Sequence, residues 1–260
     1  LPRTGGPGAG MNAKPKKTRA DTALVERGLV ESRSRAQALI MAGKVFSGEK
    51  RIAKAGDAVA DDAPLEVRGQ DHPWVGRGGL KLDHALRHFA IDVTGMTALD
   101  IGASTGGFTD VLLSRGAGRV YAVDVGHGQL AWKLRNDSRV TVLERTNARR
   151  LTAEAVPEPV DILVCDASFI GLEIILPAPL ALAAPGAWLV ALIKPQFEVG
   201  KGEVGKGGVV RDPAQHQAVC DRIRAWLDGL PGWRVVDIVE SPITGPEGNR
   251  EFLIVVRRDS

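Results

Sequence analysis

The sequence is poor in cysteine and in aromatic residues. Two cysteines, Cys165 and Cys220, occur among 260 residues, and aromatic side chains make up 5% of the chain. The cysteines are too far apart in sequence to form a C-x-x-C motif, so neither a disulfide framework nor a structural metal site is expected. Such sparing use of thiols is typical of a reducing compartment, and we expect a cytoplasmic protein.

The sequence also lacks an N-terminal segment with the basic, apolar and small-residue order of a signal peptide. We interpret Leu1–Gly10 as residues added in front of the protein's own start at Met11, and we expect them not to be part of the fold. One long and mostly apolar stretch, Leu172–Ile193, is interrupted by Glu173 and by three prolines. A helix, a Pro-Gly turn and a strand explain this stretch better than a membrane span. We therefore expect a protein without a membrane partner.

Charge is distributed unevenly along the chain. The formal net charge is +3, but residues 11–54 contain 11 Lys and Arg against 4 Asp and Glu, whereas residues 55–260 contain 22 against 27. A basic segment in front of a mildly acidic chain is typical of a module that binds nucleic acid. The apolar content of 44% fits one or two ordinary globular domains.

The basic segment has the pattern of a small folded module. Asp21 is placed to cap a short first helix, and Ser32 to cap a second helix that ends at Gly43. A strand that starts at Lys44–Phe46 and another near Leu65–Arg68 complete a small α+β unit. The second helix is expected to bury one apolar face, made by Ala36, Leu39 and Ile40.

The run S-R-S-R-A-Q-A-L-I-M-A-G-K-V, Ser32–Val45, resembles the core of the S-four-type RNA-binding domain. The resemblance covers Arg19 to about Val67 and implies an RNA-binding domain over residues 11–68. A polar linker, broken by proline, follows over residues 69–77. By resemblance, five side chains of this domain contact RNA phosphates: Arg33, Arg35, Gln37, Lys44 and Lys50.

From residue 78 to residue 260 the chain alternates strand and helix patterns. Seven apolar runs rich in β-branched residues predict strands, and apolar residues at helical spacing recur between most of them. The alternation predicts a doubly wound, Rossmann-like α/β sheet of seven strands, with its ligand site beyond the carboxyl ends of the strands. The expected strands are Ala98–Ile101, Val120–Val123, Val140–Leu143, Ile162–Cys165, Ala187–Ile193, Val235–Val239 and Phe252–Val256.

The sharpest motif follows the first of these strands. The stretch L-D-I-G-A-S-T-G-G-F-T, Leu99–Thr109, is rich in small residues that let the backbone approach a ligand closely. At the end of the next strand, Asp124 can accept hydrogen bonds from both hydroxyls of a ribose. The spacing G-x-x-x-G-G does not match the G-x-G-x-x-G of nicotinamide enzymes.

The pattern D-x-G-x-S-x-G-G, followed by a strand-end aspartate, instead resembles S-adenosylmethionine-dependent methyltransferases. The resemblance implies that Asp124 binds the cofactor ribose, and Asn147 is predicted to face the adenine. The full set of predicted cofactor contacts is Asp100, Gly102, Ala103, Ser104, Thr105, Gly106, Gly107, Phe108, Asp124, Asn147 and Asp166.

Four charged residues fall where this ligand face is expected. Lys81 lies at the start of the second domain, and Asp166 follows the fourth strand. Lys194 directly follows a long apolar run, and Glu251 precedes the last strand. The stretch Cys165–Phe169 lacks the Pro-Pro-Tyr/Phe run of methylases that act on base amino groups, which disfavours amino-nitrogen chemistry.

The tetrad resembles that of the FtsJ-type ribose 2′-O-methyltransferases, and the chain from Lys14 to Arg258 resembles the TlyA family (hemolysin A / rRNA 2′-O-methyltransferase). The strings W-V-G-R-G-G-L-K-L, D-A-S-F-I and K-P-Q-F-E-V-G-K-G support this resemblance. It implies S-adenosylmethionine as cofactor, ribosomal RNA or ribosomal subunits as partner, and a cytidine ribose as acceptor. Lys194 would then be the general base, its pKa lowered by burial and by Lys81, while Asp166 and Glu251 orient the lysines.

Three other functions stay open on the sequence alone. S-four-type domains also occur in RNA-binding or ribosome assembly factors without catalysis. A small-molecule O-methyltransferase would explain the second domain but not the basic first one. The family name suggests a pore-forming role, which no amphipathic basic helix or secretion signal supports. His84 and His88 have the spacing of a metal-ligand pair, but we interpret them as the outer face of a helix because no third ligand is evident.

Overall fold

The structure is a computed structural model that describes residues 17–30, 32–68, 72–200, 202, 204–205, 207–245 and 247–260. The residues interpreted as added in front of Met11 (1–10) and the first three linker residues (69–71) lie outside the described residues. The described residues divide into two compact units. Residues 17–25 and 32–68 form the first unit, and residues 26–30 group with those from 72 onward in the second.

The first unit is a small α+β fold. It contains two consecutive helices and five short strands, which form one two-stranded and one three-stranded sheet. Ser32 caps the second helix, because its hydroxyl accepts a hydrogen bond from Arg35 N at 3.2 Å. The elements are β1 (Lys17–Arg19), α1 (Ala20–Glu26), α2 (Arg33–Met41), β2 (Val45–Ser47), β3 (Lys50–Arg51), β4 (Ala58–Ala60) and β5 (Glu66–Val67).

The prediction that Asp21 caps the first helix is wrong. α1 already begins at Ala20, and the Asp21 side chain is fully buried. Its carboxylate accepts hydrogen bonds from Arg19, Arg33 and Gln37 at 2.9–3.1 Å. The hydrogen bond from Arg19 lowers the pKa of Asp21 well below its usual range despite burial. Asp21 therefore joins α1 to α2 and partly fixes two of the side chains predicted to bind RNA.

The second unit contains the predicted seven-stranded sheet, in the order β11-β12-β10-β9-β6-β7-β8. β6, β7, β8, β9 and β10 pair in parallel, and β12 is antiparallel to β10 and to β11. The strands are β6 (Thr97–Ile101), β7 (Arg119–Val123), β8 (Val140–Leu143), β9 (Val160–Cys165), β10 (Ala183–Ile193), β11 (Trp233–Glu240) and β12 (Phe252–Arg258).

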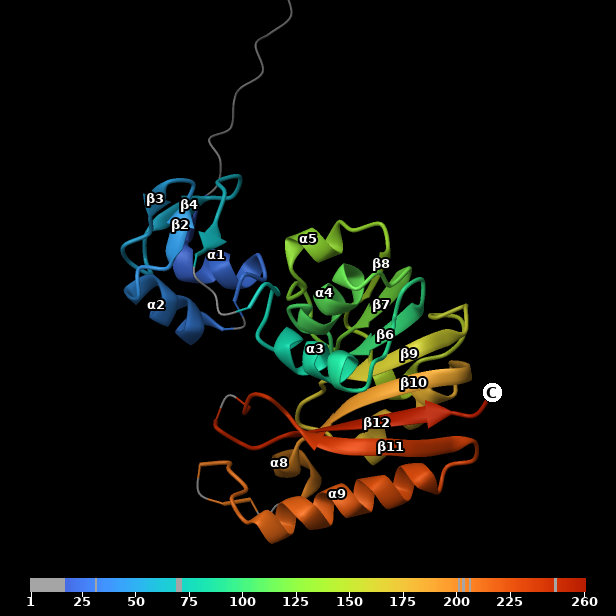
Figure 1. Cartoon of the computed structure of the whole chain (residues 1–260). Coiled ribbons are helices and arrows are strands. Elements are labelled where there is room, and N and C mark those ends of the chain that lie inside the picture. Colours follow the sequence, from blue (N-terminus) through green and yellow to red (C-terminus); the bar gives the residue numbers. More distant parts are fainter. Residues whose placement is uncertain are drawn as a thin grey trace, which may run out of the picture. The chain divides into compact units, whose positions relative to one another are not determined.

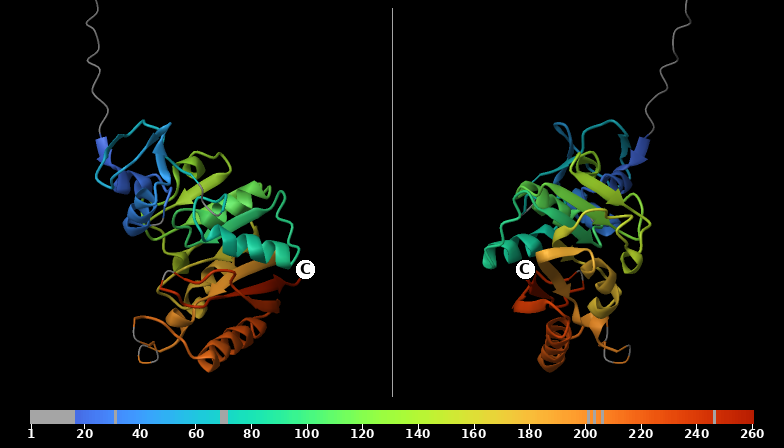
Figure 2. Two further views of the ribbon diagram at one scale, coloured as in Figure 1. Left: turned by 60° about the vertical axis from the view of Figure 1, so that its left-hand side comes forward. Right: turned by 90° about the vertical axis from the view of Figure 1, so that its right-hand side faces the viewer.

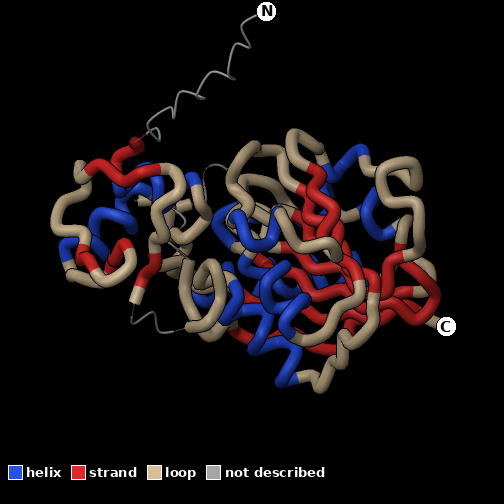
Figure 3. Tube along the Cα trace, turned by 90° about the horizontal axis from the view of Figure 1, so that it is seen from above, coloured by secondary structure: helices blue, strands red, loops and turns tan. Residues whose placement is uncertain are grey.

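Helices cover both faces of this sheet (Figures 1 and 2), and the view in Figure 3 shows strands between helical segments. Alternate strand residues fill two cores: Leu99 and Ile101 pack into one, and Ala98 into the other. The helical elements are α3 (Gly79–His88), α4 (Gly107–Ser114), α5 (Trp132–Arg135), η1 (Ala148–Arg150), α6 (Leu172–Ile175), α7 (Pro177–Leu180), α8 (Pro195–Glu198) and α9 (Pro213–Asp228).

The apolar stretch Leu172–Ile193 forms two short helices, α6 and α7, and then β10. The strand begins at Ala183, earlier than predicted, because the Pro185-Gly186 pair lies inside it at a shift of register rather than in front of it. Within the described residues, no helix is both long and apolar enough to cross a bilayer.

Candidate active site

Strand direction gathers the predicted charged residues at one edge of the sheet. Asp124, Asp166 and Lys194 directly follow the parallel strands β7, β9 and β10. Glu251 precedes β12, which runs in the opposite direction, so its backbone lies at the same edge. Lys81 reaches this edge from the first turn of α3. The structure therefore brings these chain segments together at the edge where the ligand face is predicted.

Lys81, Asp166, Lys194 and Glu251 form a continuous chain of ion pairs. Lys81 Nζ lies 2.7 Å from Glu251 Oε2 and 3.5 Å from Asp166 Oδ2. The other oxygen of Asp166 lies 2.7 Å from Lys194 Nζ, although the two groups are not aligned as a hydrogen bond. The exposed fractions are 5% for Lys81, 7% for Lys194 and 2% for Glu251. Asp166 thus bridges two nearly buried lysines.

The two lysines have different surroundings. Burial alone would lower the pKa of Lys81, but the carboxylates of Asp166 and Glu251 raise it above its usual value. Lys194 Nζ also donates hydrogen bonds to the Asp166 carbonyl at 3.1 Å and to Ser168 Oγ at 2.9 Å. The nitrogen of Lys194 is therefore fixed by three oxygen atoms, two of them from one residue.

The glycine-rich loop between β6 and α4 lies against Asp124. Asp124 accepts hydrogen bonds from Ser104 N at 2.8 Å and from Gly126 N at 2.7 Å, one on each carboxylate oxygen. Each oxygen keeps a second lone pair, which a ribose hydroxyl can use. Gly106 precedes α4 with φ +95°, a left-handed conformation that favours glycine. The loop turns tightly here and directs the N-terminus of α4 toward the same edge.

Among the residues that the structure describes, Asp100 has a free acceptor oxygen behind this loop, as a cofactor with hydrogen-bond donors would require. The residue is fully buried, and its Oδ2 accepts a hydrogen bond from Thr109 Oγ1 at 2.7 Å. Its Oδ1 is buried and has no hydrogen-bond partner among the described residues. Burial raises the pKa of Asp100 to about 7, against the hydrogen bond from Thr109. An unpaired acceptor behind the loop and an acceptor pair on Asp124 together match an amine-bearing nucleoside such as S-adenosylmethionine.

Two predicted cofactor residues are placed less simply. Phe108 lies in the first turn of α4, and its side chain is buried in the core, so it does not line the loop. Asn147 is exposed after β8, and its side chain accepts a hydrogen bond from Arg149 N at 3.1 Å, which caps η1. The neighbouring Thr146 N donates to the Asp124 carbonyl at 2.9 Å, so Asn147 lies one residue from a backbone contact with Asp124.

Sequence reasoning missed Ser168 and Phe169. Ser168 holds Lys194, and Phe169 has an 88% exposed side chain with φ +65°, an uncommon conformation for a bulky residue. Its ring lies 4.9 Å from that of Phe197 between centroids. Both residues stand within three positions of Asp166, which is the only sequence signal that could have drawn attention to them.

The residues predicted to bind RNA lie in three places. Arg33, Arg35 and Gln37 are on α2, Lys44 lies between α2 and β2, and Lys50 is on β3. Arg33, Arg35, Gln37 and Lys50 are exposed, and Lys44 is partly exposed. Arg33 and Gln37 each donate a hydrogen bond to Asp21. Arg35 and Lys50 have no such bond to Asp21, so they are the clearest candidates for contact with phosphate.

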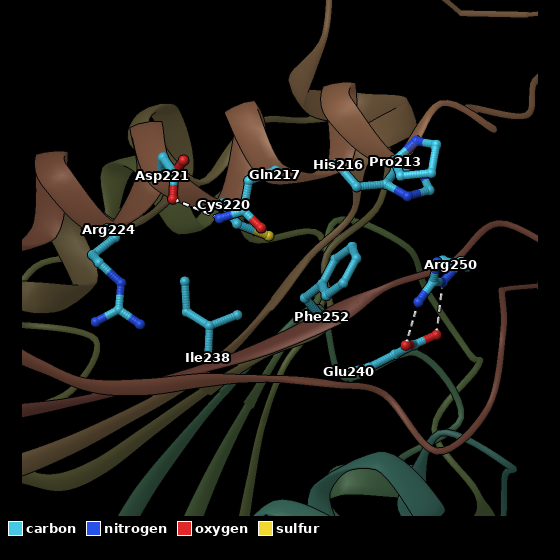
Figure 4. A pocket seen from close by; sticks show the side chains of 10 residues that line it. All are labelled: Pro213, His216, Gln217, Cys220, Asp221, Arg224, Ile238, Glu240, Arg250 and Phe252. Carbon is cyan, nitrogen blue, oxygen red and sulfur yellow. Dashed lines mark hydrogen bonds and ion pairs between the residues drawn. The ribbon is translucent and has the colours of Figure 1, made fainter.

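A cleft of about 380 Å³, away from the tetrad, lies between α9 and the strands β11 and β12 (Figure 4). Arg250 pairs with Glu240 at 2.5 Å, and Arg224 pairs with Asp237 at 3.2 Å. Because each arginine at this cleft is matched by a carboxylate, the cleft has no excess positive charge to attract a phosphate. His84 and His88 lie side by side with ring centroids 5.7 Å apart, and no cluster of three metal-ligating side chains occurs in the described part of the chain.

Comparison with known proteins agrees with this geometry. The family model of FtsJ-like methyltransferases matches residues 74–258, and that of the S4 domain matches residues 18–63. The 16S/23S rRNA (cytidine-2′-O)-methyltransferase TlyA of Mycobacterium tuberculosis is 51% identical over 93% of this chain and 90% of the relative. The chain belongs to the TlyA family of FtsJ-like methyltransferases.

Other members of the TlyA family have different names. Hemolysin A of Brachyspira hyodysenteriae is 40% identical over 90% of this chain and 98% of that protein. A solved structure from Streptococcus thermophilus, also named as a hemolysin, superposes with a TM-score of 0.74 at 41% identity. It covers 95% of this chain and is itself covered to 90%. The TlyA-family fold therefore extends over both units of this chain.

Proposed function

We propose that this TlyA-family chain transfers a methyl group from S-adenosylmethionine to the 2′-hydroxyl of a cytidine ribose in ribosomal RNA, in the cytoplasm. The observation that carries the proposal is the nearly buried chain of ion pairs through Lys81, Asp166 and Lys194 beside the glycine-rich loop. The relative from Mycobacterium tuberculosis is named as an rRNA (cytidine-2′-O)-methyltransferase, which supports the choice of cytidine ribose as acceptor.

The geometry supports distinct roles for the two lysines. When a ribose hydroxyl attacks a methyl group, it must lose its proton to a base. Lys81 stays an ammonium ion because Asp166 and Glu251 raise its pKa. Lys194, in its neutral amine form, is then the lysine that can accept the hydroxyl proton and become an ammonium ion beside Asp166. S-adenosylmethionine, when bound, supplies the methyl group on a positively charged sulfur.

We expect most of the rate acceleration to come from holding the reacting groups in the right positions. Asp124 and the loop around Gly106 would hold the cofactor, and Asp100 would offer its unpaired oxygen to a donor. Lys194, held by Asp166 and Ser168, would receive the hydroxyl in line with the methyl group. Fixed geometry of this kind lets these residues act without rearranging during the reaction.

Phe169 supports the choice of a nucleic acid as acceptor. A ribose inside a duplex is not accessible to such a site, so its nucleotide must leave the base stack. An exposed aromatic ring next to Ser168 offers a surface on which the displaced base can stack. In the first unit, Arg35 and Lys50 would add contacts with RNA phosphates that do not depend on sequence.

The tetrad also favours catalysis over a role in ribosome assembly alone. Burying three charged groups, Lys81, Lys194 and Glu251, costs free energy, which their pairing with one another and with Asp166 offsets only in part. A protein that only binds RNA gains nothing from such a cluster at the ligand edge of its sheet. Nearly buried, paired charges in this position are typical of active sites.

The test is transfer of radiolabelled methyl from S-adenosylmethionine to purified ribosomal subunits, with the product mapped by resistance to alkaline hydrolysis. We expect label at alkali-resistant linkages, because a 2′-O-methyl group removes the nucleophile that cleaves RNA in alkali. Absence of label on either subunit, with measurable cofactor binding, would contradict the proposal and favour an assembly factor.

A further inference from the structure

The short helix α8 directly continues the chain from Lys194. Pro195 occupies its first position, which fixes the backbone in a helical conformation. Phe197 N donates to the Lys194 carbonyl at 2.9 Å, and Val199 N donates to the Pro195 carbonyl at 3.0 Å. Because Lys194 caps this single turn, any shift of α8 moves the backbone of Lys194 with it.

Glu198, the last residue of α8, is the point at which this turn is anchored. Its side chain is 4% exposed, and its Oε1 accepts a hydrogen bond from Leu172 N at 2.8 Å. Leu172 N is one of the free N–H groups at the start of α6, so the carboxylate supplies an acceptor that the helix itself lacks. A Cβ atom at Gly171 would lie 3.2 Å from Glu198 Oε2, which shows how closely the carboxylate packs on this backbone.

The other oxygen of Glu198 is held by α9. Arg222 donates to Glu198 Oε2 at 2.9 Å and to the Glu198 carbonyl at 3.0 Å. The same guanidinium also pairs with Glu173. Figure 1 shows α8 beside α9, in agreement with these contacts. A buried carboxylate needs such a partner, because an unpaired one would be strongly destabilising.

These contacts join the two loops that form the site. The segment from Asp166 to Gly171 starts at the end of β9 and ends at α6, and it includes Ser168. Lys194 starts the other loop. The two segments are therefore connected at two points. Lys194 bonds to Ser168 at the site, and Glu198 bonds to Leu172 N just after the Asp166–Gly171 segment. The contact between the tilted rings of Phe169 and Phe197 is a second contact between the same two segments.

We propose that Glu198, held by Arg222, is a positioning residue for methyl transfer: it sets the distance between Lys194 and the Asp166–Ser168 segment. The inference rests on the proposed function. The hydrogen bonds that the Glu198 carboxylate accepts come from Leu172 N and Arg222 and not from a tetrad side chain, so it acts through the backbones of α8 and α6. Loss of this contact should slow the chemical step, since small misplacements of reacting groups reduce rates by about 100-fold.

The experiment compares Glu198→Ala and Glu198→Gln with the matched control Glu173→Gln. The control removes the other carboxylate that pairs with Arg222 but leaves the bond from Glu198 to Leu172 N intact. For each variant, single-turnover methyl transfer to ribosomal subunits, KM for the subunits, cofactor Kd by calorimetry and Tm are measured in the full chain.

We expect Glu198→Ala to reduce the single-turnover rate constant by about 30- to 100-fold. KM for the subunits and cofactor Kd should stay within about twofold, because neither binding surface includes Glu198. Glu198→Gln should show a smaller loss, since its amide oxygen still accepts the Leu172 N–H. The Glu173→Gln control should transfer methyl at the rate of the unchanged protein.

A full rate in Glu198→Ala would overturn the inference while leaving the proposed function in place. Equal losses of rate and of cofactor affinity would also overturn it, because they indicate general unfolding of the site. If Glu198→Ala does not fold, Glu198→Gln and Arg222→Gln decide by the same split between rate and binding. Absence of transfer by the unchanged protein would overturn the proposed function and this inference together.

Discussion

At the residue scale, Lys194 differs from the other three tetrad members in what its removal should do. Lys194→Ala removes the proton acceptor, so we expect methyl transfer to fall by about 100- to 10,000-fold. RNA binding and cofactor Kd should change little, because RNA affinity depends on other cations and Asp124 still meets the loop. Ser168→Ala, which removes one of the three oxygen contacts of Lys194, should reduce the rate less. Filter binding of RNA and methyl transfer are measured in parallel for the two variants. A Lys194→Ala variant that still transfers methyl would refute the role of Lys194 as the base.

Asp100 gives a second prediction at this scale, on stability against pH. Burial raises the pKa of Asp100 to about 7, whereas the unfolded chain has the ordinary carboxyl value of 3.8. The folded chain without cofactor then binds the proton more tightly, so this group's contribution to stability is fully present below pH 3.8, falls steadily as the pH rises, and is lost by about pH 7. Three pKa units correspond to about 4 kcal/mol as an upper limit.

The isosteric Asp100→Asn variant lacks this titration but can still accept the Thr109 hydrogen bond. Relative to the unchanged protein, we expect its Tm without cofactor to be nearly equal below about pH 4, increasingly higher as the pH rises towards 7, and higher by a constant amount above that. The same variant should bind S-adenosylmethionine more weakly, because a carboxylate oxygen has been replaced. Scanning calorimetry across this pH range measures the difference, and a difference that does not change with pH would contradict the assignment.

At the element scale, the turn before α4 depends on Gly106. A Cβ atom at this position would lie 2.2 Å from Leu134 Cδ1 on α5, and its φ of +95° disfavours any other residue. Gly106→Ala should therefore lower Tm through both strain and overlap, at a cost of about 2–4 kcal/mol, and weaken cofactor binding. Gly95 has φ +74° but nothing within 4 Å, so Gly95→Ala separates strain alone from overlap. The control Gly95→Ala should lose about 1 kcal/mol of folding free energy and keep its cofactor affinity. Calorimetric titration with cofactor distinguishes the Gly106→Ala variant from this control.

The same scale shows how much the sequence could predict. All seven strands of the sheet were predicted, because long apolar runs alternate with helical patterns, and strand ends located the tetrad. β1, β3 and β4 were not predicted, since two or three residues are too few to show a period. The roles of Asp21, Ser168 and Glu198 could not be predicted either, because each depends on which distant segments meet in the fold. Phe108 belonged to the right motif, but its orientation toward the core follows only from packing.

At the scale of the whole molecule, the uneven charge of the chain makes a prediction about RNA affinity. Neutralising phosphates releases counterions, so the logarithm of the binding constant falls linearly with the logarithm of salt concentration. Arg35 and Lys50 are exposed in the basic unit, and each one that contacts a phosphate should contribute about 0.7–0.9 to the magnitude of that slope. Arg35→Ala and Lys50→Ala should lower the slope by that amount and leave cofactor Kd unchanged.

Arg234→Ala is the matched control, because it removes the same charge from an exposed side chain at the start of β11. That end of β11 lies at the edge of the sheet opposite the tetrad. If binding depends on local contacts with the basic unit, Arg234→Ala leaves the salt slope unchanged while the other two variants reduce it. If only net charge matters, all three variants shift affinity alike, and the assignment of RNA contacts to α2 and β3 is wrong. Titrations of one RNA at four salt concentrations separate these outcomes.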